Sequence, residues 1–291
     1  MTADAPPAHP LTFGIVTGQH QLTLSQLEEQ WRMGEELGFD SVWLFDHFFA
    51  LYGDPEGPCL ETSTLLAALA LKTTRVRIGV LVYGNTHRHP AVLAKEMVTV
   101  DHLSNGRVTL GIGTGWNERE HAAYGIPFPS AGDRVAMLDE SLQVIRSLLT
   151  QPRTTFEGRF YRLQDAPFSP KPIQDKLPIL VGGKRPKMLK LIARHADVWD
   201  SGPTPDELRQ RRAQLAENCA EIGRDPSEIV CSVSLGADRL EDEQGFADLV
   251  RAYRAAGASQ LLFDFPISAT GTATAERVAR TIIPALREEL A

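Results

Sequence analysis

The sequence predicts an α/β fold, a (β/α)8 TIM barrel, over residues 11–291, behind a flexible tail of residues 1–10. Eight strand-like apolar runs alternate with eight helical patterns along the 291 residues. Most of these runs are apolar throughout, which is expected of parallel strands that are covered on both faces. A doubly wound sheet would place a glycine fingerprint after its first strand, but TGQHQ (17–21) stands there. The barrel is therefore the predicted fold, with an insertion segment before its fifth strand.

The order of the elements predicts one barrel domain that no linker divides. The first strand, LTFGIV (11–16), precedes the helix TLSQLEEQWRMGEELG (23–38), which Gly38 closes. Further strands are expected from residue 41 and over 75–82, 107–113, 177–183, 196–202, 228–236 and 259–265. The other helices are expected over 61–72, 89–103, 133–150, 185–194, 204–222, 243–256 and 273–289.

One segment interrupts this alternation. Residues 151–176 are rich in proline and aromatic side chains, lack helical periodicity, and are too many for a plain barrel connection. We therefore expect an inserted lid or a short β excursion before the fifth strand.

The composition limits the kinds of partner. No apolar run approaches the ~18 residues of a membrane span, and the first ten residues lack the layout of a signal peptide. We therefore expect a cytoplasmic protein that does not bind a membrane. The formal net charge of −7 argues against nucleic acid, because phosphate backbones reward clustered cations. Cys59, Cys219 and Cys231 are widely spaced and odd in number, which indicates neither a disulfide framework nor a zinc site.

Barrel enzymes build their sites from the loops that follow the carboxyl ends of the strands, so polar residues at these positions are the candidates. They are Gln19, His20, Asp46, His47, residues 83–89, Thr114 to Asn117, Gly182 to Lys187, Asp200, Ser201 and Asp264.

The stretch ILVGGKRPKMLK (179–190) predicts a phosphate site. Gly182 and Gly183 end a strand without side chains that would obstruct a ligand, and Pro186 suits the first turn of a helix whose free amides bind anions. Four cations, Lys184, Arg185, Lys187 and Lys190, follow in an otherwise acidic chain. A solvated basic helix face would explain the charges alone, but not the glycine pair at the strand end.

Histidines follow two of the strands. Asp46 and His47 leave an apolar strand together, so burial is expected to perturb their pKa values. His87 and His89 have the spacing of a metal site, but Pro90 and a helix follow them and no converging ligands are evident. We therefore expect no metal, and expect Arg88 and His89 to pack the loop at the start of the helix.

Four stretches together resemble the bacterial luciferase-like superfamily of flavin and deazaflavin oxidoreductases, and in particular its coenzyme F420-dependent branch. They are LGFDSVWLFDHF (37–48), VLVYGNTHRHPAVLAKEMVTVDHLSNGRVTLGIGTGW (80–116), YGIPFPSAGDRVAMLDESLQVIRSLL (124–149) and PILVGGKRPKMLKLIARHADVWDSG (178–202). The resemblance covers nearly all of residues 11–291. It implies a barrel, often dimeric, that binds a flavin or deazaflavin ring at its mouth, so a homodimer is expected.

The resemblance also implies roles for individual residues. Asp46 and His47 would lie beside the ring, a non-prolyl cis peptide within 81–84 would support it through Val82 and Tyr83, and Thr114 and Gly115 would touch it. Gly182 and Gly183, with the amides near Lys184 and Arg185, would receive the phosphate. The alternating glycines of LGIGTGW (110–116) would let a strand end approach the flat ring.

This chain departs from the family in ways that bear on the substrate. The sugar-phosphate dehydrogenase branch carries Trp and Glu where this chain has Leu51 and Trp116, which argues against glucose 6-phosphate as the substrate. Close relatives tend to have a small residue at Tyr83 and Trp near Ser63, so a reshaped pocket is expected.

The expected function is hydride transfer between coenzyme F420 and a small organic substrate, with His47 as the proton donor or acceptor. One alternative is an FMN-dependent monooxygenase supplied with reduced flavin by a separate reductase. Another is a cofactor-binding barrel without catalysis.

Overall fold

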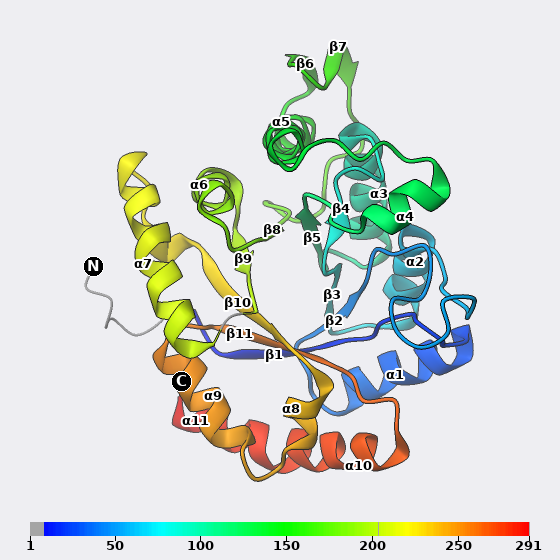
Figure 1. The fold of residues 1–291 in the computed structure, drawn as a ribbon, viewed down its shortest axis with the longest axis vertical. Coiled ribbons are helices and arrows are strands. Elements are labelled where there is room, and N and C mark those ends of the chain that lie inside the picture. Colours follow the sequence, from blue (N-terminus) through cyan, green and yellow to red (C-terminus); the bar gives the residue numbers. More distant parts are fainter. Residues whose placement is uncertain (1–8, 203, 291) are drawn as a thin grey trace.

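The computed structural model describes residues 9–202 and 204–290, which form a closed barrel of eight parallel strands surrounded by helices (Figure 1). The barrel strands are β1 (Thr12–Val16), β2 (Ser41–Leu44), β3 (Arg77–Val80), β5 (Val108–Gly113), β8 (Ile179–Gly182), β9 (Val198–Asp200), β10 (Val230–Leu235) and β11 (Gln260–Asp264). The pairing of β1 with β11 and of β3 with β5 closes the ring. The predicted TIM barrel is confirmed.

The helices lie outside the strands, as Figure 1 shows for α1, α2 and α3 on one side and α6 and α7 on the other. They are α1 (Leu24–Glu36), α2 (Thr62–Lys72), α3 (Pro90–Leu103), α4 (Glu118–Tyr124), α5 (Ala131–Thr150), α6 (Pro186–His195), α7 (Pro205–Glu221), α8 (Ala237–Glu241), α9 (Phe246–Ala255), α10 (Ala269–Arg277) and α11 (Ile283–Glu289). Among these described helices, none combines the length and the apolar character that crossing a bilayer requires.

The insertion segment is a β-hairpin, so the expectation of a short β excursion is confirmed. Strands β6 (Arg153–Glu157) and β7 (Arg162–Pro167) pair antiparallel beside α5, at the top of the view in Figure 1. Glu140 on α5 accepts hydrogen bonds from three turn amides, at 2.8 Å from Arg159, 2.9 Å from Phe160 and 3.1 Å from Tyr161. The hairpin is therefore tied to the helix that precedes it.

Some element boundaries differ from those expected. The second strand ends at Leu44, so Phe45 to Phe49 form a loop. The helix expected over 243–256 is α9, and a further short helix, α8, precedes it outside the expected range. The helix expected from residue 273 begins at Ala269 and contains a π-helical turn, Val278–Ile282. Helix α4 was missed because a helix of seven residues is too short to show apolar periodicity.

The core has two layers. The larger layer lies between the helices and the outer face of the barrel, and includes Phe13, Trp31 and Leu110. A smaller cluster of Val16, Trp43, Leu180 and Leu262 comes from the alternate strand positions that face the barrel interior, and Leu81 and Val82 pack on it. This interior cluster forms the floor on which the candidate site is built.

At the amino-terminal end, residues 1–8 of the expected tail lie outside the described residues. His9 is held in place, because its Nε2 lies 2.8 Å from the carbonyl of Ser227 and its own carbonyl accepts a hydrogen bond from Arg254.

Candidate active site

A cavity of about 270 Å³ opens at the carboxyl end of the barrel. The loops after β2, β3, β5 and β8 form it, which is the position at which barrel enzymes carry their sites. Its lining residues are Asp46, His47, Leu81, Val82, Tyr83, Gly84, His87, Gly113, Thr114, Gly115, Trp116, Asn117, Glu120 and Gly182. The structure thus brings together seven of the predicted site residues, which are Asp46, His47, Val82, Tyr83, Thr114, Gly115 and Gly182.

The floor of the cavity is formed by Leu81 and Val82. The peptide bond between them is cis, which confirms the expectation of a non-prolyl cis peptide within 81–84. The glycines of β5 make room for this segment. A Cβ on Gly111 would lie 2.0 Å from the carbonyl oxygen of Val80, and one on Gly113 would lie 2.9 Å from Val82 Cγ2. These glycines therefore accommodate the neighbouring chain, which in turn presents Val82 to the cavity.

The side chain of Tyr83 is fully buried and points toward α2, where the hydroxyl of Ser63 donates to its phenol oxygen at 3.3 Å. The guanidinium of Arg88 lies 4.9 Å from the centre of its ring. Burial raises the pKa of Tyr83, so the phenol stays neutral. The phenol group therefore contributes to the packing of α2 and α3. The short strand β4 (Tyr83–Gly84) contributes backbone atoms to the lining of the cavity.

Asp46 is a buried anchor. Its carboxylate accepts hydrogen bonds from the amide of Gly84 at 2.8 Å, from His87 Nδ1 at 2.9 Å and from Arg88 at 2.8 Å. Burial alone would raise the pKa of Asp46, but the hydrogen bond from His87 and the charge of Arg88 outweigh it, and the pKa is lowered. Asp46 therefore stays ionised and fixes the loop that carries Val82.

His47 is paired with a carboxylate that the sequence analysis did not identify. Its Nδ1 donates to Glu120 Oε2 at 2.9 Å, and the other oxygen of Glu120 accepts a hydrogen bond from the amide of Phe48. Burial opposes ionisation of Glu120, but these two hydrogen bonds prevail and lower its pKa. Glu120 lies on α4, where Asn117 caps the helix by accepting from the Glu120 amide. The one sequence signal for this helix was Asn117, a residue type favoured at the N-cap, shortly after the end of a strand.

This pairing leaves Nε2 as the reactive nitrogen of His47. With Nδ1 bound to Glu120, Nε2 makes no hydrogen bond within the described part of the chain, and the side chain is 13% exposed. A carboxylate on one nitrogen fixes the tautomer and orientation of an imidazole, so that the other nitrogen can exchange a proton. His47 is therefore placed for acid–base chemistry at the wall of the cavity.

The start of α6 leaves anion-binding groups free. Arg185 is the N-cap and makes no side-chain capping bond, Pro186 opens the helix, and the amides of Lys184 and Arg185 donate no hydrogen bond to other described residues. Their side chains are exposed and form no ion pair in the described structure. Lys190, by contrast, lies 3.4 Å from Glu221 on α7, so it is not available to a ligand in this arrangement. Gly183 leads directly from the cavity residue Gly182 to this helix start.

Other polar strand ends serve the barrel itself. Gln19 holds the loop after β2 through the carbonyl of Phe45 and the hydroxyl of Thr62. Asp200 is fully buried and accepts from Ser232 at 2.8 Å and Ser234 at 3.1 Å. Burial raises the pKa of Asp200 to about 6, although both serines oppose the shift. Burial, with the charge of Asp238, also raises the pKa of Asp264 to about 6.

Both histidines of the H-x-H pair make hydrogen bonds within the fold. His89 caps α3 by accepting a hydrogen bond from the Ala91 amide, as expected of a residue that packs at the start of this helix, while His87 is hydrogen-bonded to Asp46. Within the described residues, no three His, Cys, Asp or Glu side chains are grouped as metal ligands would be.

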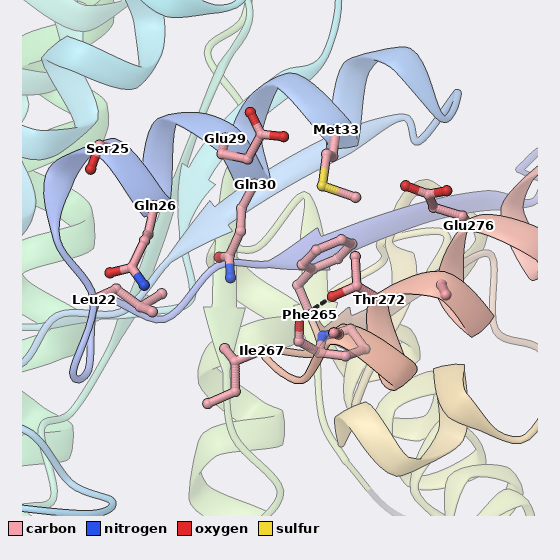
Figure 2. Close-up of a pocket in the computed structure, with 13 residues that line it drawn as sticks. Leu22, Ser25, Gln26, Glu29, Gln30, Met33, Phe265, Ile267, Thr272 and Glu276 are labelled. Atoms are coloured by element: carbon pink, nitrogen blue, oxygen red, sulfur yellow. Dashed lines mark hydrogen bonds between the residues drawn. The ribbon is translucent and has the colours of Figure 1, made fainter.

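A second, shallower groove of about 550 Å³ lies between α1 and α10 (Figure 2). Figure 2 shows Gln26 and Gln30 extending from α1 toward Leu22 and Phe265, and the Thr272 hydroxyl donating to the Pro266 carbonyl at 3.2 Å. The groove shares no lining residue with the cavity, and it holds none of the predicted site residues.

A closed (β/α)8 barrel with a polar cavity at its carboxyl end has the architecture in which barrel enzymes carry their sites. Comparison with known proteins narrows the class. The family model described as luciferase-like monooxygenase matches residues 11–285, and the chain belongs to this family.

Several relatives and solved structures that this chain resembles are named for coenzyme F420. An F420-dependent glucose-6-phosphate dehydrogenase of Kineococcus radiotolerans is 36% identical over 237 residues, which cover 80% of this chain and 69% of that protein. An uncharacterized protein of Mycobacterium tuberculosis is 34% identical over 225 residues, or 76% of this chain and 75% of that protein. The solved structure of an F420-dependent secondary alcohol dehydrogenase in complex with an F420-acetone adduct has the same fold. Its TM-score is 0.85 at 21% identity, with 95% of this chain and 99% of that chain covered.

Proposed function

We propose that the protein is an oxidoreductase that transfers a hydride between coenzyme F420 and a small organic substrate. The observation that carries the proposal is that three features adjoin one another in the cavity. Val82 forms its floor, His47 with its bonded carboxylate lies in its wall, and the free start of α6 follows Gly182. The relatives that are named for F420 support the same cofactor.

The residues present fit such a cofactor. Val82 packs on the apolar interior cluster and offers a flat, dry floor to a tricyclic ring, and Gly113 and Gly182 border it without side chains. Lys184, Arg185 and their amides would hold the phosphate, since they are exposed and unpaired in the described structure. Asp46 and Tyr83 would act by fixing the backbone of the floor, and Thr114 and Gly115 would border the ring.

Bound F420 would supply an obligate hydride carrier, and the protein would supply orientation and proton management. His47 Nε2 would take the hydroxyl proton of an alcohol substrate as the substrate carbon gives its hydride to the cofactor. In the direction of reduction, His47 Nε2 would return that proton to the substrate oxygen. The carboxylate of Glu120 stabilises the protonated imidazole in either direction.

An FMN-dependent monooxygenase is the second candidate, because the matching family is described as luciferase-like monooxygenase. Only in that case would the protein need a separate flavin reductase as a partner. Both cofactors share the ring, the ribityl chain and the first phosphate. Only F420 continues into a tail with further carboxylates, for which Lys184, Arg185 and Lys187 offer complementary charge.

The deciding experiment is a titration of F420 and FMN, oxidised and reduced, at low and at high ionic strength. We expect tighter binding of F420, with a gap that narrows as salt screens the tail. Tighter binding of FMN together with substrate-dependent oxygen consumption would replace the proposal by the monooxygenase. Binding of F420 without turnover of any compound in a broad panel of alcohols and carbonyl compounds would leave a binding protein.

A further inference from the structure

Aromatic rings surround the side chain of His47. The ring of His47 lies 5.8 Å from that of Trp116, 6.1 Å from that of His20 and 6.5 Å from that of Phe45, measured between ring centroids. The ring of Tyr52 meets that of His20 edge-on at 5.8 Å. Of these residues, His47 and Trp116 line the cavity, so a substrate oxygen bonded to His47 Nε2 would bring its carbon skeleton close to the ring of Trp116.

Trp116 is the exposed residue among these rings that also lines the cavity. It is 67% exposed, whereas Trp31, Trp43 and Trp199 are at most 2% exposed. An indole beside a cavity offers a large, rigid apolar surface to a ligand at low entropic cost. Since Trp116 also lines the cavity, a bound substrate would cover part of this surface.

The carboxylates of Asp46 and Glu120 make the lining of the cavity acidic. The lining contains no Lys or Arg, and the pKa values of both carboxylates are lowered. The His47–Glu120 pair has no net positive charge in either state of the imidazole. Burial, with a contribution from His47, lowers the pKa of His20 to about 4, so its imidazole is neutral near pH 7.

The nearby arginines are already occupied. Arg88 binds Asp46 at 2.8 Å and Glu61 at 2.6 Å, and the guanidinium of Arg119 lies 5.1 Å from the centre of the Phe49 ring. Lys184 and Arg185 stand at the start of α6, where the proposed function uses them for the cofactor. A phosphate or carboxylate beside His47 would therefore enter a site of negative charge without a partner.

We infer that the substrate is an uncharged aromatic or cyclic alcohol, or the matching carbonyl compound, whose oxygen bonds to His47 Nε2 and whose ring packs against Trp116. This inference rests on the proposed function for its chemistry. It sets this chain apart from its relatives that are named for glucose 6-phosphate, whose phosphate group needs cations that this cavity does not offer.

Trp116 makes the inference testable without turnover, because it is the one exposed tryptophan of four. Quenching of tryptophan fluorescence by acrylamide therefore reports chiefly on this residue. The probes are benzyl alcohol and 4-(hydroxymethyl)benzoate, which differ only in a carboxylate, together with glucose 6-phosphate. Each is titrated with the full-length protein, with and without F420, and the affinities are measured independently by calorimetry.

We expect benzyl alcohol to protect Trp116 from acrylamide, and both anions to bind at least about 10-fold more weakly, the equivalent of one uncompensated charge contact. Trp116→Ala should weaken the binding of benzyl alcohol by about 5- to 10-fold through lost aromatic contact. Ile222→Ala, which shortens an exposed apolar side chain beyond the end of α7, is the matched control and should bind as the wild type does.

Equal binding of the neutral and carboxylated alcohols, absence of protection by benzyl alcohol, or an unchanged affinity in Trp116→Ala would each overturn the inference. The proposed function fails separately, through the cofactor titration. A protein that binds benzyl alcohol at Trp116 but does not bind F420 would retain the inferred ligand class and lose the proposed cofactor.

Discussion

At the scale of single residues, the chemistry depends on two imidazole–carboxylate pairs that do different work. His87 and Arg88 keep Asp46 ionised, and Asp46 in turn holds the amide of Gly84, so this pair is structural. His47 and Glu120 stand at the cavity wall with the Nε2 of His47 free of other described residues. The Asp46–His47 dipeptide thus divides its roles, because successive residues of an extended loop point in different directions.

Replacing His47 by Gln should lower turnover by roughly 10² to 10⁴ while the affinity for the cofactor changes by no more than about threefold. The amide keeps most of the size of the ring but cannot exchange a proton. Steady-state kinetics and a cofactor titration on the same preparation measure both effects. Joint loss of affinity and turnover would make His47 a cofactor contact instead.

Glu120→Gln should lower kcat by about 10- to 100-fold, because an amide stabilises a protonated imidazole less well than the carboxylate that is bonded to His47 Nδ1. The amide oxygen can still accept from the Phe48 amide, so thermal unfolding should change little. Steady-state kinetics and thermal unfolding measure the two effects, and a loss of kcat that comes only with a loss of stability would show that the carboxylate acts through packing.

At the scale of elements, two neighbouring strand ends are specialised in opposite ways. The end of β8 leads into α6 and exposes unbonded amides and two free cations within the described chain. The end of β9 buries the carboxyl of Asp200 against the serines of β10. A phosphate group of a ligand would neutralise the cations at the start of α6, whereas no positive group among the described residues compensates the carboxyl of Asp200.

Reversal of both cations, Lys184→Glu with Arg185→Glu, should weaken cofactor binding by roughly 1.5 to 3 kcal/mol, the contribution of a charge-assisted hydrogen bond. Lys190→Glu is the control on the same helix, since Lys190 pairs with Glu221 rather than facing the cavity. A cofactor titration of both variants makes the comparison. Unchanged affinity in the double variant would remove the start of α6 from the site.

Asp200→Asn should stabilise the protein at neutral and alkaline pH. Because burial raises the folded pKa of Asp200 to about 6, from an ordinary value of 3.8, ionisation above these values costs more in the folded state than in the unfolded state. The cost is absent below the unfolded pKa, grows as the pH rises to about 6 and persists above it. The free energy of unfolding should therefore increase by about 1–3 kcal/mol near pH 8 and by much less near pH 4.

Chemical denaturation of the wild type and Asp200→Asn across that pH range provides the measurement. Asp206→Asn, at a carboxylate whose side chain is 86% exposed, is the matched control and should give no pH-dependent gain. A gain for Asp200→Asn that does not depend on pH would assign the effect to packing rather than to charge.

At the scale of the whole molecule, we expect a homodimer that buries the exposed apolar side chains of α2 and α3. Leu71, next to the last residue of α2, is 66% exposed, and Val92, near the start of α3, is 52% exposed. Light scattering after size-exclusion chromatography should give twice the chain mass of 32.0 kDa. Leu71→Glu with Val92→Glu should yield the monomer, because charges there would be buried unpaired. A monomeric wild type would refute the expectation.

The sequence by itself determined the barrel, the place of the insertion and the loops that form the cavity. These follow from local patterns, since apolar periodicity marks strands and helices, and a parallel barrel brings all strand ends to one face. The resemblance to the family predicted a non-prolyl cis peptide within 81–84, and the structure has it between Leu81 and Val82. The domain boundaries, the cytoplasmic location and the cofactor-binding role of each site residue stay predictions.

Only the tertiary structure decided which side chains meet. Glu120 lies 73 positions from His47, and nothing local to either residue indicates their pairing. Lys190 resembles Lys184 in sequence, but it is paired because α7 brings Glu221 to it. The pKa of Asp46 is lowered by the hydrogen bond from His87 and the charge of Arg88, 41 and 42 positions away, whereas burial raises the pKa of Asp200. Burial and long-range contacts set these charges, and neither is a property of the local sequence.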